Sequence, residues 1–266
     1  MKINNTSGLF SLLVATAIYG LYGTFSRLIG LSFGIFSQNL IRNFIVVVIS
    51  MTIVFLFGSW KTIRRTDRKW LFIWILSSLS TTFGSFIAFN KLAIGTTYFL
   101  FHAGMILGGY IVGKIVFGEM LNRIKVLSLF LILIGLSIIF SISLTSDLLI
   151  WAVIAFISGA STGVWNTMSK KISQHYSSIQ LTILDGLGGL IFSIIAAQIF
   201  HEQISKISFS LTWIVLILFA LCQLVNLQLI VYGFRKTQAQ IGSLVMPLEI
   251  VFGALFAYII FHETIS

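Results

Sequence analysis

Charged residues are scarce in this sequence, making up 9% of its 266 residues, whereas 58% are hydrophobic. A soluble domain of this length carries roughly a quarter charged residues, so the chain cannot build a water-solvated surface. It also lacks the ~10-residue alternating segments of membrane barrels. It has instead continuous runs rich in Leu, Ile and Phe, each close to the ~20 residues that a bilayer-spanning helix needs. The composition predicts an all-α integral membrane protein.

Cysteine is nearly absent, and catalytic motifs are missing. The single cysteine, Cys222, excludes an intrachain disulfide and any multi-cysteine metal site. The sequence contains no H-E-x-x-H, nucleophile elbow or Walker motif. The GLGG stretch at 186–189 falls inside an apolar run, which argues against a phosphate-binding loop. We therefore expect no enzyme, no cofactor and no metal site.

The apolar runs predict nine transmembrane helices joined by short loops. Their expected ranges are 8–29, 35–58, 70–90, 94–117, 124–144, 148–169, 178–200, 211–233 and 240–262. The first run is too long for a signal-peptide core and is interpreted as a retained helix.

The net charge of +10 is explained by orientation in a membrane, not by nucleic-acid binding. With the N-terminus in the cytoplasm, twelve of the seventeen Lys and Arg residues fall on the cytoplasmic side and three on the other side. This bias predicts a multi-pass protein of the cell inner (plasma) membrane with a cytoplasmic N-terminus.

An internal repeat becomes visible when the sequence is shifted by 144 residues. Arg27 then falls on Lys171, Lys91 on Arg235, and Glu119 on Glu263. A repeat of this length holds five spans, so the second copy enters the membrane inverted, as in many secondary transporters. We predict a first repeat at 1–144 and a second, inverted one at 145–266 that lacks the last helix. The alternative is that similar apolar runs align by chance.

Several motifs follow one another in a characteristic order. They are YGLYGTFSR from Tyr19, Arg42 in the second span, the Gly118-Glu119 pair, GVWNTMSKK from Gly163, and MPLEIVFGALFAYIIFHE from Met246. In this order the chain resembles the EamA family of the drug/metabolite transporter (DMT) superfamily. Three features depart from the family pattern: Ile250 stands in place of Pro, His262 in place of Gly, and no tenth helix follows.

The resemblance implies two inverted five-helix repeats and a secondary permease, acting as exporter or exchanger. We expect transport of a small polar metabolite, such as an amino acid, by alternating access. The alternative is a non-transporting or truncated membrane protein that keeps the permease fold. Expected partners are the metabolite, the lipid bilayer and a coupling proton or counter-substrate; the chain could also form a homodimer.

Ionisable, amide and aromatic side chains inside the predicted spans are the candidate substrate-binding residues. An ionisable side chain within a span costs at least ~2.5–3.5 kcal/mol, so it usually faces a cavity or a partner. The candidates are Arg42, Tyr98, His102, Trp165, Asn166, Asp185, Asn226 and Glu249.

The charged candidates each allow more than one interpretation. Arg42 and Asp185 lie at similar depths and could form a charged pair at a cavity, with Arg42 attracting an anionic group. The alternatives are a purely structural ion pair, or an Arg42 side chain that extends along its helix to the membrane interface. Glu249 could bind a substrate amine or carry a proton, or it could be a protonated helix contact. A lone histidine such as His102 is more often a packing residue.

The remaining candidates, Tyr98, Trp165, Asn166 and Asn226, could shape a pocket for a zwitterionic or aromatic metabolite, although Trp is also a common interface anchor.

Residues at helix ends and small residues within helices have predicted structural roles. Glu119 and Glu263 are expected to have structural roles, capping or pairing the next helix. Three small-residue patterns let helices approach closely: Gly104-x-x-x-Gly108, Gly109-x-x-x-Gly113 and Gly159-x-x-x-Gly163.

Overall fold

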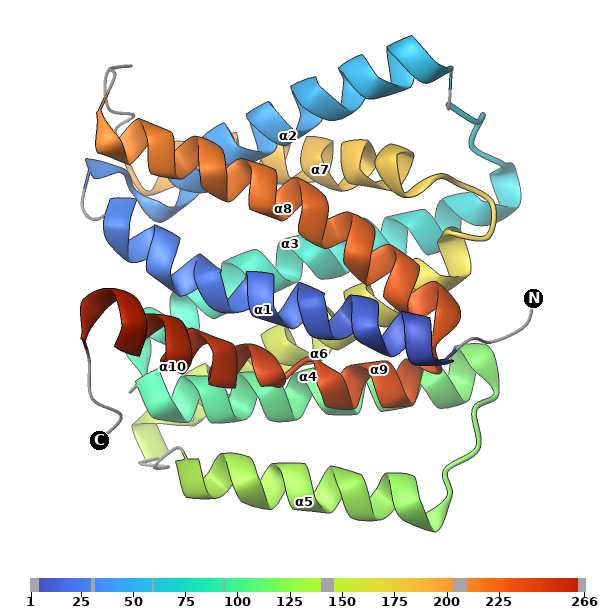
Figure 1. Ribbon diagram of the computed structural model, residues 1–266. Helices are drawn as coiled ribbons and strands as arrows, with labels where there is room; N and C mark the ends of the chain where they lie inside the picture. Colours follow the sequence, from blue (N-terminus) through green and yellow to red (C-terminus); the bar gives the residue numbers. More distant parts are fainter. Residues whose placement is uncertain are drawn as a thin grey trace. The chain divides into compact units, whose positions relative to one another are not determined.

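The computed structural model describes residues 5–29, 32–58, 60–92, 94–139, 146–202 and 210–262, and within them all regular structure is helical (Figure 1). The α-helices are α1 (Asn5–Ile29), α2 (Ile35–Phe57), α3 (Arg68–Lys91), α4 (Ile94–Phe117), α5 (Arg123–Ile139), α6 (Leu149–Ile172), α7 (Ser178–Ile199), α8 (Leu211–Lys236), α9 (Ala239–Val245) and α10 (Leu248–Phe261). Short 3-10 turns, Arg65–Asp67 and Ser146–Leu148, precede α3 and α6.

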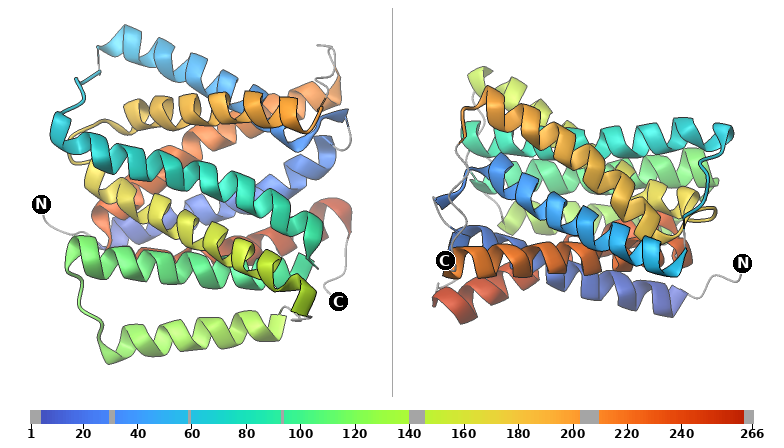
Figure 2. Two further views of the ribbon diagram at one scale, coloured as in Figure 1. Left: turned by 180° about the vertical axis from the view of Figure 1, so that it is seen from behind. Right: turned by 90° about the horizontal axis from the view of Figure 1, so that it is seen from above.

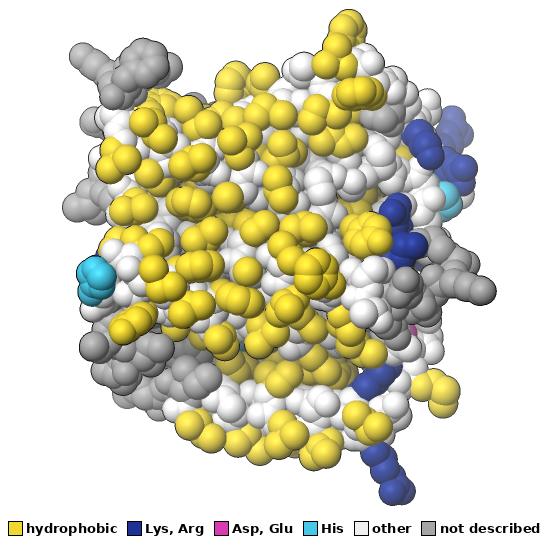
Figure 3. Space-filling model, viewed as in Figure 1, with side chains coloured by type: hydrophobic (Ala, Val, Ile, Leu, Met, Phe, Trp, Pro, Cys, Tyr) yellow, Lys and Arg dark blue, Asp and Glu magenta, His cyan; other side chains and the backbone are white. Residues whose placement is uncertain are grey.

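Seven segments within the described residues are long and apolar enough to cross a membrane. They coincide with α1, α2, α4, α6, α7, α8 and the joined α9–α10 segment. Large apolar side chains point outward from these helices, including Phe55 at 88% exposure and Ile115 at 77%, and apolar side chains cover much of the face shown in Figure 3. Because water would not tolerate so large an apolar surface, the chain is a multi-pass membrane protein.

The two other predicted spans fall short for identifiable reasons. The described part of α5 has 17 residues, and serine and threonine lower the hydropathy of α3. The hydroxyls of α3 bond back to their own helix, as Ser77 Oγ does to Ile73 O at 2.7 Å and Thr81 Oγ1 to Ser77 O at 2.9 Å. Such bonding removes much of the cost of placing the α3 hydroxyls in an apolar environment. That α3 and α5 span the membrane stays a prediction.

The ninth predicted span is not one continuous helix. α9 ends at Val245 and α10 begins at Leu248, with a turn at Met246 and Pro247 between them. Proline has no N–H and its ring clashes with the preceding turn. Pro247 therefore accounts for a break that the prediction of an uninterrupted helix at 240–262 missed.

The chain forms two compact units, each assembled from segments far apart in sequence. The first unit comprises residues 1–9, 64–174 and 233–247, and the second comprises 10–63, 175–232 and 248–266. Helices α3, α4, α5, α6 and α9 therefore belong to the first unit, and α2, α7 and α10 with most of α1 and α8 to the second.

Glycines hold the first unit together. A Cβ added at Gly104 or Gly108 of α4, or at Gly159 or Gly163 of α6, would lie under 3.0 Å from the backbone of the other helix. In Figure 2 (left) α3, α6 and α4 lie side by side, and α5 lies on the outer side of α4. The prediction that these glycine patterns allow close helix approach is confirmed.

The second glycine pattern of α4, Gly109-x-x-x-Gly113, faces α9. An added Cβ at Gly109 would meet the Ser243 side chain of α9, and one at Gly113 would lie 2.7 Å from Gln240 Cγ.

In the second unit, α2 packs along α7 and α1 packs against α8. Tyr22, Phe25 and Ile29 of α1 surround Leu216 and Phe219 of α8 in one apolar cluster. α1 and α10 cross where Gly20 faces Gly253, since an added Cβ on Gly20 would lie 2.7 Å from Gly253 N.

Candidate functional site

The eight candidate residues divide evenly between the two units. Arg42 on α2, Asp185 on α7, Asn226 on α8 and Glu249 on α10 belong to the second unit. The first unit contains Tyr98 and His102 on α4 and Trp165 and Asn166 on α6.

A row of three polar residues on α2 forms the centre of the second unit's polar cluster. Asn39, Arg42 and Asn43 are spaced three and four residues apart, so they share one face of the helix. Asn39 and Asn43 are buried. Asn39 Nδ2 donates to Ser193 Oγ of α7 at 2.8 Å, and Asn43 Oδ1 accepts from Gln223 Nε2 of α8 at 2.9 Å. The row therefore ties α2 to both of its neighbours.

Two glycines of α7 make room for this row. A Cβ on Gly189 would collide with the Asn43 amide, and one on Gly186 would lie 2.6 Å from Val47 Cγ2. These glycines belong to the GLGG stretch, which lies within α7 as predicted. Its structural role is the close approach of α2 to α7.

Arg42 is held without a carboxylate partner among the described residues. Its Nη2 donates to Asn39 Oδ1 at 2.8 Å, and its Cζ lies 3.9 Å from the centre of the Phe219 ring. Its Nε is buried and makes no hydrogen bond with the described residues. The charged pair expected between Arg42 and Asp185 is thus not formed; an amide and an aromatic ring take the place of the carboxylate.

Two tyrosines of α1 extend the cluster. Tyr19 and Tyr22 pack edge to face at 5.0 Å, and Tyr22 packs against Phe219 at 4.7 Å. Tyr22 lies within electrostatic range of Arg42 and Asn226, and Tyr19 within range of Asp185 and Glu249. The four second-unit candidates are therefore linked through α1 tyrosines.

Asn226 is almost completely buried, at 1% exposure. Neither of its amide atoms makes a hydrogen bond of normal geometry with the described residues. Gln223 Oε1, one turn earlier on α8, is also buried without such a bond. An unsatisfied buried polar atom costs about 1–3 kcal/mol, so these amide atoms lower the stability of the second unit.

The candidates in the first unit make packing contacts instead. The Trp74 and Trp165 rings stack at 6.1 Å, and Trp74 Nε1 donates to Trp165 O at 2.9 Å. Tyr98 and His102 stack at 6.0 Å within α4. Asn166 Nδ2 lies 4.0 Å from Met105 Sδ. Substrate binding by Tyr98, His102, Trp165 and Asn166 stays a prediction.

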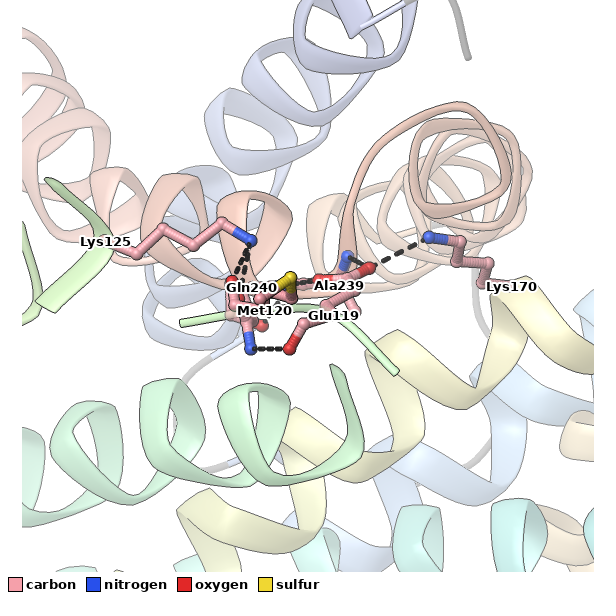
Figure 4. A network of polar contacts seen from close by, with 7 residues as sticks. Glu119, Met120, Lys125, Lys170, Ala239 and Gln240 are labelled. Carbon is pink, nitrogen blue, oxygen red and sulfur yellow. Dashed lines mark hydrogen bonds and ion pairs between the residues drawn. The ribbon is translucent and has the colours of Figure 1, made fainter. Parts of the chain in front are cut away.

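A second polar network lies at one end of the first unit and is built on Glu119 (Figure 4). The Glu119 carboxylate accepts from the backbone N–H groups of Ala239 at 2.6 Å and Gln240 at 3.0 Å, and it pairs with Lys170 Nζ at 3.1 Å. Lys125 Nζ donates to Gln240 Oε1 at 2.7 Å. A carboxylate at a helix N-terminus satisfies free N–H groups and complements the helix dipole. Glu119 has the structural role predicted for it, but the helix that it caps is α9 and not the next helix, α5; Glu263 lies outside the described residues.

This network borders an open pocket of about 670 Å³ lined by Phe117–Asn122, Lys125, Lys170 and Gln238. The side chains of Glu119, Lys125 and Lys170 are already bonded within this network. We therefore interpret the network as a structural link between α4, α6 and α9.

A similar carboxylate contact occurs in the second unit. Glu202, which follows α7, accepts from the N–H groups of Ser37 at 2.8 Å and Phe36 at 3.3 Å, at the start of α2. At the other end of the α2–α7 pair, the Gln180 side chain bonds to both backbone groups of Lys61, at 3.1 and 2.6 Å. The pair is therefore fixed at both ends.

Sequence reasoning missed Asn39, Asn43, Tyr22, Phe219 and Gln223. A usable signal existed for the two asparagines, because they lie on the same helical face as Arg42. Over the part of the chain that the structure describes, no group of three or more His, Cys, Asp or Glu side chains could hold a metal ion.

Comparison with known proteins identifies the family but no substrate. Residues 149–266 match the model of the EamA-like transporter family. One of the solved structures that match, described only as the crystal structure of a protein, superposes with a TM-score of 0.82 at 12% identity, covering 98% of this chain and 91% of that one. At this identity the likeness concerns the fold alone. No curated protein matches the sequence. The match to this family, which is part of the drug/metabolite transporter superfamily, covers residues 149–266, the second half of the chain.

Proposed function

We propose that this protein is a secondary transporter of a small polar metabolite, such as an amino acid, and that it works by alternating access. The observation that carries the proposal is Arg42: a guanidinium inside a membrane-spanning helix, with no carboxylate partner among the described residues and with a buried Nε that makes no hydrogen bond there. Keeping such a group in an apolar environment is costly, and a bound substrate would offset that cost.

The other polar groups of the second unit support the same site. Asp185 and Glu249 contribute to the electrostatic environment of Tyr19, and Asn226 to that of Tyr22. An acid near a binding site could receive a substrate amine or carry a coupling proton, and we assign this role to Glu249. The resulting site offers a cation, an acid, amides and aromatic rings, which together suit a zwitterionic solute.

Helix positions support the inverted repeat that alternating access needs. Shifted by 144 residues, α2 (35–57) falls on 179–201 beside α7 at 178–199, and α3 (68–91) falls on 212–235 within α8 at 211–236. In the same way α4 (94–117) falls on 238–261, which holds α9 and α10. We propose repeats at 1–144 and 145–266, five and four spans, in the cell inner membrane with a cytoplasmic N-terminus.

Flux measurements in proteoliposomes test the proposal. The purified protein is reconstituted and uptake of a labelled amino-acid mixture is measured for the wild type, Arg42→Ala and Glu249→Ala. We expect Arg42→Ala to lower flux at least about tenfold, as loss of a charge-assisted contact implies, and Glu249→Ala to change the pH dependence of the remaining flux. Ser50→Ala, a buried α2 position, is the matched control.

Unchanged flux and pH dependence in both variants would falsify the site assignment. The alternative, a non-transporting protein that keeps the permease fold, predicts that the wild type itself shows no flux above protein-free liposomes.

A further inference from the structure

We infer that Ser193 and Asn39 form a relay that positions Arg42 to bind an oxyanion, a carboxylate or a phosphate group, at its Nε. This inference rests on the proposed function and deepens it, since it names the recognised group and the residues that orient the recognising one. All three residues belong to the second unit.

The direction of the relay follows from donor and acceptor chemistry. A guanidinium has donors only, so the Asn39 amide must turn its oxygen toward Arg42. That orientation leaves Asn39 Nδ2 facing α7, where Ser193 Oγ accepts its hydrogen bond at 2.8 Å. Ser193 is fully buried at 0% exposure and Asn39 is 9% exposed. The serine thereby fixes the amide, and the amide fixes the guanidinium.

Phe219 restricts Arg42 further. Arg42 Cζ lies over the Phe219 ring, 3.9 Å from its centre, a favourable cation–π arrangement. With Nη2 bonded to Asn39 and Cζ over the ring, the Arg42 side chain cannot turn to place Nε elsewhere. Nε remains buried and without a partner among the described residues.

The charges around Arg42 favour an anionic ligand. Two acidic residues of the second unit, Asp185 and Glu249, contribute to the electrostatic environment of Tyr19, and the Tyr22 phenol contributes to that of Arg42. The contacts of Arg42 with described residues are an amide and an aromatic ring, not a carboxylate. Oxyanions form the strong, charge-assisted hydrogen bonds that a desolvated guanidinium requires.

The inference is tested on the full-length protein in detergent by NMR of the arginine Nε–H groups. Arg42→Lys, which lacks this group, assigns its resonance. The protein is titrated with sodium acetate, sodium phosphate and, as a control, sodium chloride. We expect the Arg42 Nε resonance to shift saturably with acetate, phosphate or both in the millimolar range. The loop residues Arg65 and Arg68 report non-specific anion binding in the same spectra.

Three variants separate positioning from simple structural support. Asn39→Asp keeps an acceptor for Arg42 but adds a carboxylate that competes with the ligand, so it should weaken oxyanion binding about tenfold or more, while the protein stays folded. Asn39→Leu removes both bonds and should weaken binding by a smaller factor. Ser193→Ala should weaken it least, and Ser50→Ala should leave it unchanged.

Acetate binding alone identifies a carboxylate site, and phosphate binding alone a phosphate site. The inference is overturned if Nε responds to neither ion, if it responds only in parallel with Arg65 and Arg68, or if Asn39→Asp binds oxyanions as tightly as the wild type. Failure of the proposed function is a different result, namely unchanged flux in Arg42→Ala.

Discussion

The two units differ in what lies between their helices. In the first unit, α4 and α6 meet through glycines and backbone, and α6 also bonds to α3, where Ser158 Oγ donates to Thr81 O at 2.9 Å. In the second unit, α2, α7 and α8 meet through amides and a guanidinium. Buried polar atoms without a hydrogen bond to the described residues occur in both units, such as Asn166 Oδ1 in the first and Asn226 Oδ1 in the second. The units therefore differ in the kind of contact between their helices: close packing through glycines stabilises a membrane fold, whereas polar side chains between helices suit the solute recognition that we propose for the second unit.

The largest expected effect comes from breaking the glycine contact of the first unit. Gly159→Leu would drive a side chain into the Phe101 backbone, and because backbone cannot yield, we expect a loss of about 3 kcal/mol or more in stability. Heating the protein in detergent and following the folded fraction by size exclusion measures the loss. The matched control is Gly135→Leu on α5, where an added Cβ has nothing within 4 Å. Equal melting temperatures for the two variants would contradict the packing argument.

The next effect concerns the polar network around Glu119. Glu119→Ala removes the acceptor of two α9 N–H groups and the partner of Lys170, so we expect a loss of about 2 kcal/mol. Glu119→Gln keeps one acceptor oxygen and should lose about half as much. The same thermal assay distinguishes them. If Glu119→Gln were as damaging as Glu119→Ala, charge pairing with Lys170 would outweigh capping.

In the second unit, we expect substitutions at Gly34 and Glu202 to disrupt the same contact, the Glu202 carboxylate at the start of α2. An added Cβ at Gly34 would collide with the Glu202 carboxylate, so Gly34→Ala displaces the cap that Glu202→Ala removes. Each single variant should cost about 1 kcal/mol, and the double variant little more than either one. A double-mutant cycle by thermal denaturation measures the coupling, and additive losses would show that Gly34 acts independently.

Much of the fold could be predicted from the sequence because it depends on local patterns. Apolar runs gave the helices within a few residues, and small residues spaced by four gave the α4–α6 contact. Capping by Glu119 was predicted, but its target was not, since α9 lies 120 residues further along the chain. The break at Pro247 had a local signal, the proline itself, which the length of the apolar run concealed.

The site was harder to predict, because it depends on which helices become neighbours. Arg42 stands out in any hydropathy profile, but its partners Asn39 and Phe219 gain meaning only once α2 lies beside α8. Asp185 has the charge and the depth expected of a partner, but the contacts described for Arg42 are with Asn39 and Phe219. Residue type indicated which side chains matter, and tertiary packing decided which of them meet.

The smallest expected effect has the opposite sign from the others and tests the comparison most directly. Asn226→Leu replaces a buried amide that has no hydrogen bond of normal geometry among the described residues by an apolar side chain of similar size. Removing the desolvation cost should raise stability by up to about 1 kcal/mol and lower flux in proteoliposomes, the usual trade between stability and function. Ser158→Ala in the first unit should instead lower stability by about 1 kcal/mol, because its hydroxyl is bonded to Thr81 O. If both variants shifted the melting temperature in the same direction, the distinction between a close-packed scaffold and a polar recognition core would not hold.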